Sequence, residues 1–299
     1  MIKPPALIKG DKIGLVAPAR KITQEELQPA VDIIRSKGFI PVYDERLFSA
    51  DRQFAGNDKL RAVYFQHLLD NPEIKAIFSV RGGYGSVRII DQLDFSVFNL
   101  YSKWLIGYSD FTVFHSHVNQ QLGVQTLHAT MPLNFGSNTP EALDGLFDVL
   151  QGNTPEYYLE QHLFNRRGDA KGILTGGNLS VLYSLLGSNS FPETEGKVLF
   201  IEDLDEYLYH VDRMMMALFR AGILSGLKGL IVGGMTDMND NEIPFGKTAE
   251  QIIQEAVKKY DYPVCFGFPA GHIDNNMPLI MGAEVRLEVA EKSHIIFME

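Results

Sequence analysis

The first half of this chain alternates short apolar runs with amphipathic stretches, and this alternation limits the possible folds more than any other feature. Apolar runs typical of buried strands lie at residues 13–17, 39–43, 74–80, 104–106 and 124–127. Between them, apolar residues mostly recur at helical spacing. Strands that alternate with helices in this way predict a parallel sheet covered by helices on both faces.

Capping residues indicate where several of these helices begin. Thr23 followed by Glu26 forms a capping box, which predicts a helix over residues 24–37. Asn57 or Asp58 caps a second helix, which is expected to reach about residue 69. Further helices are expected over residues 86–93, 111–122 and 140–150.

The second half begins after residues 151–170, which lose apolar periodicity and are rich in Gly, Asn, Pro and charged residues. We interpret this stretch as a linker between a domain of residues 1–150 and a domain of residues 171–299. The second domain again alternates strands and helices, and its tail after residue 279 is expected to form three short strands. The predicted fold class is therefore α/β with two domains.

Composition limits both the kinds of partner and the compartment that we expect for this protein. A formal net charge of −10 argues against nucleic acid or an anionic membrane surface as the main partner, although a local site can still bind a small anion. The single cysteine, Cys265, cannot form an internal disulfide, which fits a reducing compartment. The first residues lack the apolar core of a signal peptide, and no apolar run approaches the ~20 residues of a membrane span. We therefore expect a cytoplasmic protein.

Residues 103–117 (KWLIGYSDFTVFHSH) combine a strand, a tight turn and a helix, with Ser109 in the turn. This arrangement exposes a hydroxyl beside a helix N-terminus. The G-x-S-x-G elbow is incomplete, because Phe111 stands where its second glycine would be. A serine that only caps the following helix explains the same pattern.

Ligands of open α/β sheets bind beyond the carboxyl ends of the strands, so the residues just after each apolar run are the candidate site. Ser109 follows one run, Glu202 follows a second, and His272 comes shortly after a third. A serine, a histidine and a carboxylate are the groups that acyl transfer requires as nucleophile, general base and orienting acid.

Both the histidine and the carboxylate have rivals. His128 also follows a strand, and the sequence favours His272 over it only modestly. Glu202 is preferred to Asp203, because the latter would point to the opposite face of a continuing strand. The acidic cluster at residues 202–206 is also explained as a complement to the dipole of the next helix.

The glycine turn at residues 81–86 (RGGYGS) follows another strand, but it matches neither a P-loop nor a dinucleotide fingerprint. Its backbone N–H groups would suit an anion nest or half of an oxyanion hole, and an ordinary tight turn explains it equally well. Residues 237–248 begin like a calcium loop but lack its glycine and its terminal glutamate. The chain has neither an H-E-x-x-H motif nor paired cysteines, so no metal and no other cofactor is expected.

Six motifs together resemble those of the LD-carboxypeptidases, serine peptidase family S66, which also contains the microcin C self-immunity peptidases. They are IGLVAPA (13–19), RGGYGS (81–86), IGYSD (106–110), TGGNLS (175–180), LFIED (199–203) and GFPAGH (267–272). The resemblance spans nearly the whole chain. It implies an N-terminal flavodoxin-like α/β domain, a smaller β-rich C-terminal α/β domain, a site between them, and a homodimer.

The same resemblance implies a role for each candidate residue. Ser109 would be the nucleophile, His272 the general base and Glu202 its carboxylate partner. The backbone N–H groups of Asp110 and Gly83 would form the oxyanion hole.

The implied reaction removes the terminal D-alanine of a murein tetrapeptide during peptidoglycan recycling, after either meso-diaminopimelate or L-lysine. Arg81, Tyr84 and Asn178 are expected to contact this substrate. One departure from the family is visible, since residues 128–131 read His-Ala-Thr-Met instead of His-Gly-Pro-Met.

Two alternative functions remain. A microcin C-like peptidyl-nucleotide hydrolase would typically be longer and carry an aromatic loop, whereas the single tryptophan, Trp104, lies in the strand before Ser109. A non-catalytic small-ligand binding module would use Ser109, Arg81 and Tyr84 as anion contacts, and would not require Glu202 or His272 near the serine.

Overall fold

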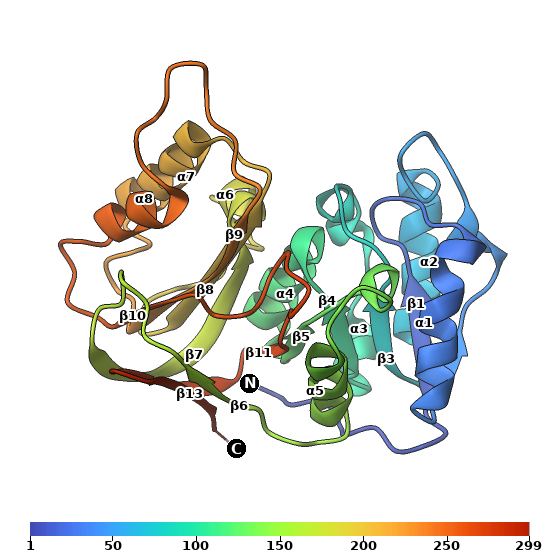
Figure 1. Ribbon diagram of the computed structural model, residues 1–299. Coiled ribbons are helices and arrows are strands. Elements are labelled where there is room, and N and C mark those ends of the chain that lie inside the picture. Colours follow the sequence, from blue (N-terminus) through green and yellow to red (C-terminus); the bar gives the residue numbers. More distant parts are fainter. Residues whose placement is uncertain (299) are drawn as a thin grey trace.

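In the computed structural model, which describes residues 1–298, the chain forms two β-sheets with helices packed around each (Figure 1). Most strands of the first sheet come from the first half of the chain, and all strands of the second sheet come from the second half. This arrangement confirms the predicted two-domain α/β class.

The first sheet has the strand order β11-β5-β4-β3-β1-β2. Strands β1 to β5 are parallel in the 2-1-3-4-5 order of flavodoxin-like sheets, and β11 is antiparallel to β5. The strands are β1 (Lys12–Val16), β2 (Ile40–Val42), β3 (Ile74–Ser79), β4 (Trp104–Gly107), β5 (Thr126–His128) and β11 (Leu279–Met281).

The second sheet has the order β10-β9-β8-β7-β12-β13-β6. Strands β7 to β10 are parallel, and the other three pair antiparallel. The strands are β6 (Glu156–Leu159), β7 (Gly168–Asn178), β8 (Val198–Leu204), β9 (Gly229–Thr236), β10 (Val264–Phe266), β12 (Glu284–Val289) and β13 (Ser293–Phe297). The three tail strands predicted from the sequence are therefore present, divided between the two sheets.

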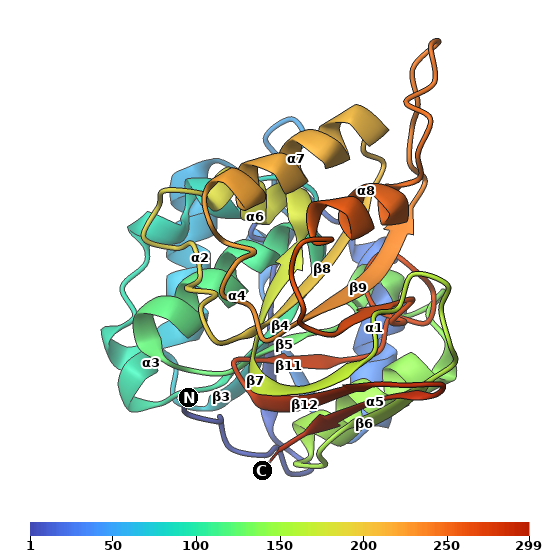
Figure 2. The same cartoon turned by 90° about the vertical axis from the view of Figure 1, so that its left-hand side faces the viewer.

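Three helices, α6, α7 and α8, lie together on one side of the second sheet in both views (Figures 1 and 2). Their apolar residues share one buried cluster with β8, β9 and β10, which includes Met214 and Met215. The helices are α1 (Gln24–Ser36), α2 (Asp58–Asp70), α3 (Ser96–Leu100), α4 (Thr112–His117), α5 (Pro140–Leu150), α6 (Leu179–Leu185), α7 (Leu208–Arg220) and α8 (Ala249–Ala256). None of the helices in residues 1–298 combines the length and apolar character that crossing a membrane requires.

The capping box predicted for the first helix is present. The backbone N–H of Glu26 donates to the Thr23 hydroxyl, and the Glu26 carboxylate accepts from the Thr23 N–H. These bonds satisfy two of the N–H groups that a helix start leaves without partners. The predicted start of α1 is therefore confirmed.

Two local predictions are wrong. Residues 86–93 form two short 3₁₀ turns, Ser86–Arg88 and Ile90–Gln92, instead of one α-helix. The backbone bonds here join residues three apart, from Arg88 N–H to the Gly85 carbonyl and from Ile89 N–H to the Ser86 carbonyl, and no side chain caps either turn. Residues 151–170 contain β6 and the start of β7, because β13 from the C-terminal tail supplies a partner for β6 that the local sequence does not reveal.

Candidate active site

The turn after β4 holds Ser109 in an unusual backbone conformation. Its φ of 63° lies in the left-handed region, which serine rarely adopts and which costs about 1–3 kcal/mol. Phe111 replaces the second elbow glycine without a clash because Gly107 has no side chain, and a Cβ there would lie 2.8 Å from Phe111 Cγ. The incomplete motif therefore still gives a strained turn that presents the serine hydroxyl.

The structure brings the three candidate residues into one chain of hydrogen bonds. His272 Nε2 lies 3.0 Å from Ser109 Oγ, and His272 Nδ1 lies 2.7 Å from Glu202 Oε2. Ser109 follows β4 of the first sheet, whereas Glu202 lies on β8 of the second and His272 on the loop after β10. The set therefore spans the two sheets.

The surroundings of the histidine determine which nitrogen carries the proton. The Glu202 carboxylate can only accept, so Nδ1–H donates to it and Nε2 remains free to accept from the Ser109 hydroxyl. Burial alone would lower the pKa of His272, but the charge of Glu202 and its hydrogen bond outweigh burial and raise it above 6.5. Glu202 is fully buried, and no other described residue donates to its carboxylate. Its charge is therefore available to stabilise an imidazolium.

The residue before the histidine must be glycine. Gly271 has a φ of 110°, and a Cβ there would lie 2.6 Å from Glu202 Oε2 and 2.8 Å from Glu202 Cβ. This close approach lets the loop after β10 pass over β8 and places His272 on the carboxylate.

Replacing Gly271 with alanine is expected to lower kcat by about 100-fold or more, because the methyl group displaces Glu202 from the imidazole. The strained φ should also destabilise the fold by about 1–3 kcal/mol. Gly267→Ala is the matched control, since Gly267 lies in the same loop at a φ of 75° but a Cβ there meets its nearest atom only at 3.5 Å. Steady-state kinetics and thermal denaturation of both variants would distinguish the effect of the clash with Glu202 from the effect of the strained φ. If kcat fell equally in Gly271→Ala and Gly267→Ala, displacement of Glu202 would be excluded as the cause.

The glycine turn after β3 lies against the serine. A Cβ at Gly82 would lie 3.1 Å from Ser109 Oγ, so a larger residue would cover the hydroxyl. The Asp110 carboxylate accepts a hydrogen bond of 2.8 Å from the backbone N–H of Ser86, which holds the turn beside the serine. Within residues 1–298, no hydrogen bond occupies the backbone N–H of Asp110 or of Gly83. Both groups are therefore free to bind an oxyanion.

Contacts behind the site join the two halves of the molecule. The Thr112 hydroxyl at the start of α4 accepts a 3.0 Å hydrogen bond from the backbone N–H of Asn178 at the end of β7. A Cβ at Gly177 would lie 2.5 Å from the same hydroxyl oxygen. Close packing at this point fixes the second sheet relative to the helix that follows the serine.

Asn178 is buried, and its side chain is already engaged. Its Oδ1 caps α6 by accepting from Val181 N–H, and its Nδ2 donates to Asp203 at 2.9 Å. Burial and the neighbouring Glu202 raise the pKa of Asp203 to about 7. The expected substrate contact by Asn178 therefore stays a prediction, while its observed contacts are internal.

The other two expected substrate residues, Arg81 and Tyr84, differ in how far their side chains are already bound by the protein. Arg81 donates to the backbone carbonyl of Lys21 at 3.1 Å and lies 3.6 Å from the Glu26 carboxylate. Tyr84 is 48% exposed and packs beside Phe54. Tyr84 is thus the more accessible of the pair, and its substrate contact also stays a prediction.

His128, the rival histidine, is fully buried, and neither ring nitrogen has a hydrogen-bond partner among the described residues. Its ring packs against Tyr108 and Phe200. Burial first, and then the nearby rings of His115 and His272, lower its pKa well below the ordinary value. It is therefore a neutral packing residue, and no hydrogen bond joins it to Ser109.

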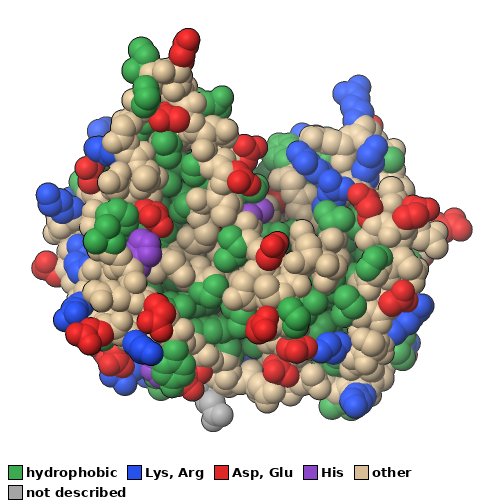
Figure 3. Space-filling view, in the orientation of Figure 1, with side chains coloured by type: hydrophobic (Ala, Val, Ile, Leu, Met, Phe, Trp, Pro, Cys, Tyr) green, Lys and Arg blue, Asp and Glu red, His purple; other side chains and the backbone are tan. Residues whose placement is uncertain are grey.

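Figure 3 shows a hollow between the two halves of the molecule, with a histidine side chain visible inside it. Lys and Arg side chains gather beside the hollow on the N-terminal half, and Asp and Glu side chains lie on the opposite side. The two walls of the hollow thus differ in charge.

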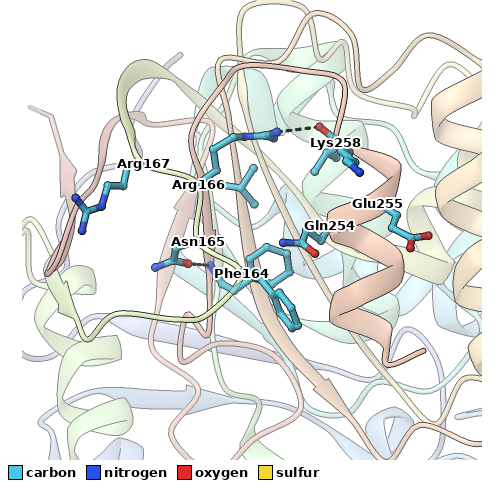
Figure 4. Close-up of a pocket in the computed structure, with 10 residues that line it drawn as sticks. Phe164, Asn165, Arg166, Arg167, Gln254, Glu255 and Lys258 are labelled. Carbon is cyan, nitrogen blue, oxygen red and sulfur yellow. Dashed lines mark hydrogen bonds between the residues drawn. The ribbon is translucent and has the colours of Figure 1, made fainter. Parts of the chain in front are cut away.

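A second hollow lies elsewhere, between α8 and the chain segment that covers β10 (Figure 4). It has a volume of about 640 Å³ and is lined by Phe164, Arg166, Arg167, Lys258 and Phe266, among others. Arg166 donates to the backbone carbonyls of Val257 and Tyr262. None of the lining residues belongs to the serine–histidine–carboxylate set.

Sequence analysis missed three residues that shape the site, namely Gly82, Thr112 and Gly271. The two glycines are needed for close approach, and the signal for Gly271 was its position directly before the candidate histidine in GFPAGH. Thr112 gave no signal, because its partner Asn178 is distant in the sequence.

Comparison with known proteins places the chain among peptidases. The LD-carboxypeptidase N-terminal domain matches residues 13–129, and the LD-carboxypeptidase C-terminal domain matches residues 171–287. A probable murein peptide carboxypeptidase of Bacillus subtilis is 30% identical, with 98% of this chain and 94% of the relative covered.

Two solved structures have the same fold. The muramoyltetrapeptide carboxypeptidase from Oxalobacter formigenes superimposes with a TM-score of 0.88 at 26% identity, covering 96% of this chain and 99% of the other. The microcin C7 self-immunity protein MccF, in complex with aspartyl sulfamoyl adenosine, also gives 0.88, at 23% identity with 100% and 99% coverage. At that identity the second likeness shows the fold alone.

Proposed function

Since the chain belongs to the LD-carboxypeptidase family, we propose that it is a serine-type carboxypeptidase that releases the terminal D-alanine of murein tetrapeptides. The observation that carries the serine mechanism is the hydrogen-bond chain from Ser109 through His272 to Glu202. The names of the murein peptide relatives support the substrate class. The cytoplasmic location and the homodimer rest on the sequence expectations and stay predictions.

The geometry favours an enzyme over a binding module. A module that binds an anion through Ser109 has no need of a histidine and a carboxylate from another sheet. Here both residues reach the serine across the two halves of the molecule, with a buried carboxylate held against the imidazole. Burying a carboxylate is unfavourable unless its charge is used, and pairing with a developing imidazolium uses it.

In the first half of the proposed reaction, Ser109 Oγ attacks the carbonyl carbon of the bond before D-alanine while His272 Nε2 takes the hydroxyl proton. The carbonyl oxygen becomes an oxyanion that accepts from the backbone N–H groups of Asp110 and Gly83. Glu202 stabilises the positive charge that forms on the imidazole.

The tetrahedral intermediate then collapses and the bond to the D-alanine nitrogen breaks. His272 returns its proton to this nitrogen, so D-alanine leaves with a neutral amine and Ser109 carries the shortened peptide as an ester. Water attacks the ester by the same route, with His272 taking its proton and giving it back to Ser109 Oγ. The proton balance closes without any cofactor.

The proposal is tested by incubating the protein with tetrapeptides that contain either meso-diaminopimelate or L-lysine, followed by mass spectrometry. Loss of one alanine, with release of free D-alanine, is the expected result, and the faster substrate identifies the preferred diamino acid. The reaction should proceed equally in EDTA, because residues 1–298 contain no cluster of three or more His, Cys, Asp or Glu side chains suited to a metal. Intact tetrapeptides after long incubation would disprove the function.

The pH dependence of kcat/KM should report the histidine. A general base must be neutral, so activity should rise with pH through the pKa of His272, which pairing with Glu202 places above 6.5. Glu202→Gln removes the charge that raises this pKa, so the rise should move to lower pH while kcat falls. Profiles measured from about pH 5 to about pH 9 test both points. A rise centred below 6.5, or one that Glu202→Gln leaves in place, would contradict the assignment.

A further inference from the structure

A carboxypeptidase must distinguish a chain end from an internal peptide bond, and the group that marks the end is a carboxylate. In proteins, arginine recognises carboxylates best, because its planar guanidinium donates two parallel hydrogen bonds. This inference rests on the proposed function. It concerns which cation beside the glycine turn would bind the carboxylate of the D-alanine that leaves.

Two of the arginines around the turn are already occupied. Arg61 is buried and donates to Asp58 and to the carbonyls of Pro18 and Gly85. Arg88 forms a two-pronged ion pair with the same aspartate. Neither guanidinium is free for a ligand.

Arg81 is also held, by the carbonyl of Lys21 and the nearby Glu26 carboxylate. Arg20 differs from these arginines. Its side chain is exposed and forms no hydrogen bond or ion pair with any residue in 1–298. It nevertheless has a defined position, because a Cβ at Gly83 would lie 2.5 Å from Arg20 Cδ and 2.7 Å from Arg20 Nε.

The order of strands places Arg20 near the same edge of the first sheet as Ser109, with the glycine turn between them. β1, β3 and β4 are neighbours in the first sheet, with β3 in the middle. The segment after β1 carries Arg20, the turn after β3 carries Gly82 and Gly83, and the turn after β4 carries Ser109. Arg20 therefore lies across the glycine turn from the serine.

The glycine turn touches both residues within two consecutive positions. A Cβ at Gly82 would lie 3.1 Å from Ser109 Oγ, and a Cβ at the next residue, Gly83, would lie 2.7 Å from Arg20 Nε, so the serine and the arginine flank the same two-residue segment. On the substrate, the terminal carboxylate lies only one residue, about 3.5 Å, beyond the carbonyl that Ser109 attacks, so it is held beside this segment too. We propose that Arg20 is the specificity-determining residue that binds the terminal carboxylate of the peptide while Gly83 binds the oxyanion.

The test compares a tetrapeptide that ends in free D-alanine with the same peptide ending in D-alaninamide. Wild-type protein should prefer the free acid by about 100-fold or more in kcat/KM, because the amide cannot form the charged pair. Arg20→Ala should lower kcat/KM for the acid by about 100-fold and change it for the amide by no more than about 3-fold. Arg20→Lys should fall between the two, since an ammonium keeps the charge but loses the planar fork.

Lys21→Ala is the matched control, because Lys21 is the next residue, is also exposed, and its side chain forms no hydrogen bond or ion pair in residues 1–298. It should keep the wild-type preference. An Arg20→Ala protein that still prefers the free acid would overturn the inference and leave the proposed function standing. Equal losses on both peptides in Arg20→Ala and Arg20→Lys would also overturn it, because a structural role affects both substrates. Wild-type protein that releases nothing from either peptide would refute the proposed function, and the inference with it.

Discussion

Replacing Ser109 with alanine is expected to lower kcat for D-alanine release by about 10⁵-fold or more while leaving the protein folded. Ser109, His272 and Glu202 act as a unit in the proposed mechanism, so loss of the nucleophile alone removes most of the catalysis. The variant should still bind the tetrapeptide, since the oxyanion donors Asp110 and Gly83 belong to the backbone. The comparison is made by steady-state kinetics at saturating substrate, with circular dichroism to check the fold.

Ser116→Ala is a matched control for this experiment. Ser116 lies on α4, is 3% exposed, and its hydroxyl has no hydrogen-bond partner among the described residues. Removing that hydroxyl breaks no hydrogen bond to a described residue, so kcat and the melting temperature should stay close to wild type. If Ser109→Ala retained activity comparable to Ser116→Ala, the serine mechanism would be wrong.

The second large effect is expected at His272, and the informative comparison is with His128. His272→Ala removes the base that takes the Ser109 proton and should lower kcat by about 10⁴-fold or more. His128→Ala removes a buried ring whose nitrogens contact no partner, so its main effect should be a loss of packing, by analogy with large-to-alanine core substitutions of about 3–5 kcal/mol. Once the folded fraction is taken into account, kcat of this variant should fall by no more than about 10-fold.

Stability and activity must be measured together for this pair. Thermal denaturation followed by circular dichroism gives the loss of stability, and kcat is measured well below the melting temperature of each variant. His128→Leu, which refills part of the space, should recover stability without restoring any lost proton transfer. A folded His128 variant that loses more activity than His272→Ala would reverse the assignment of the base.

Most of the site could be predicted from residues placed at strand ends. Ser109 and Glu202 lie in or next to apolar runs, and the parallel order of each sheet brings the carboxyl ends of its strands to one edge. What this reasoning could not decide was the choice between His272 and His128, because both follow strands. The structure separates them by burial and by the carboxylate on β8, which depends on how the two sheets pack.

The features that could not be predicted depend on partners distant in the sequence. β6 forms because β13 pairs with it, and the two are separated by most of the second half of the chain. The turns at residues 86–92 begin at Ser86, whose backbone N–H donates to the carboxylate of Asp110, a residue of the next strand–helix turn. The freedom of Arg20 could be recognised only after its neighbours had been matched with their carboxylates and carbonyls.

The position of β11 has a consequence for the order in which the protein can form during synthesis. β11 covers the outer edge of β5, although residues 279–281 leave the ribosome long after residues 126–128. Until then, the first sheet has an unpaired parallel edge, the kind of surface on which other chains pair and aggregate. The nascent N-terminal half must therefore wait, through the translation of about 150 further residues at some 5–20 residues per second, for the strand that closes it. Truncation just before β11 would leave that edge open permanently, so a strand that is made late protects the sheet that was made first.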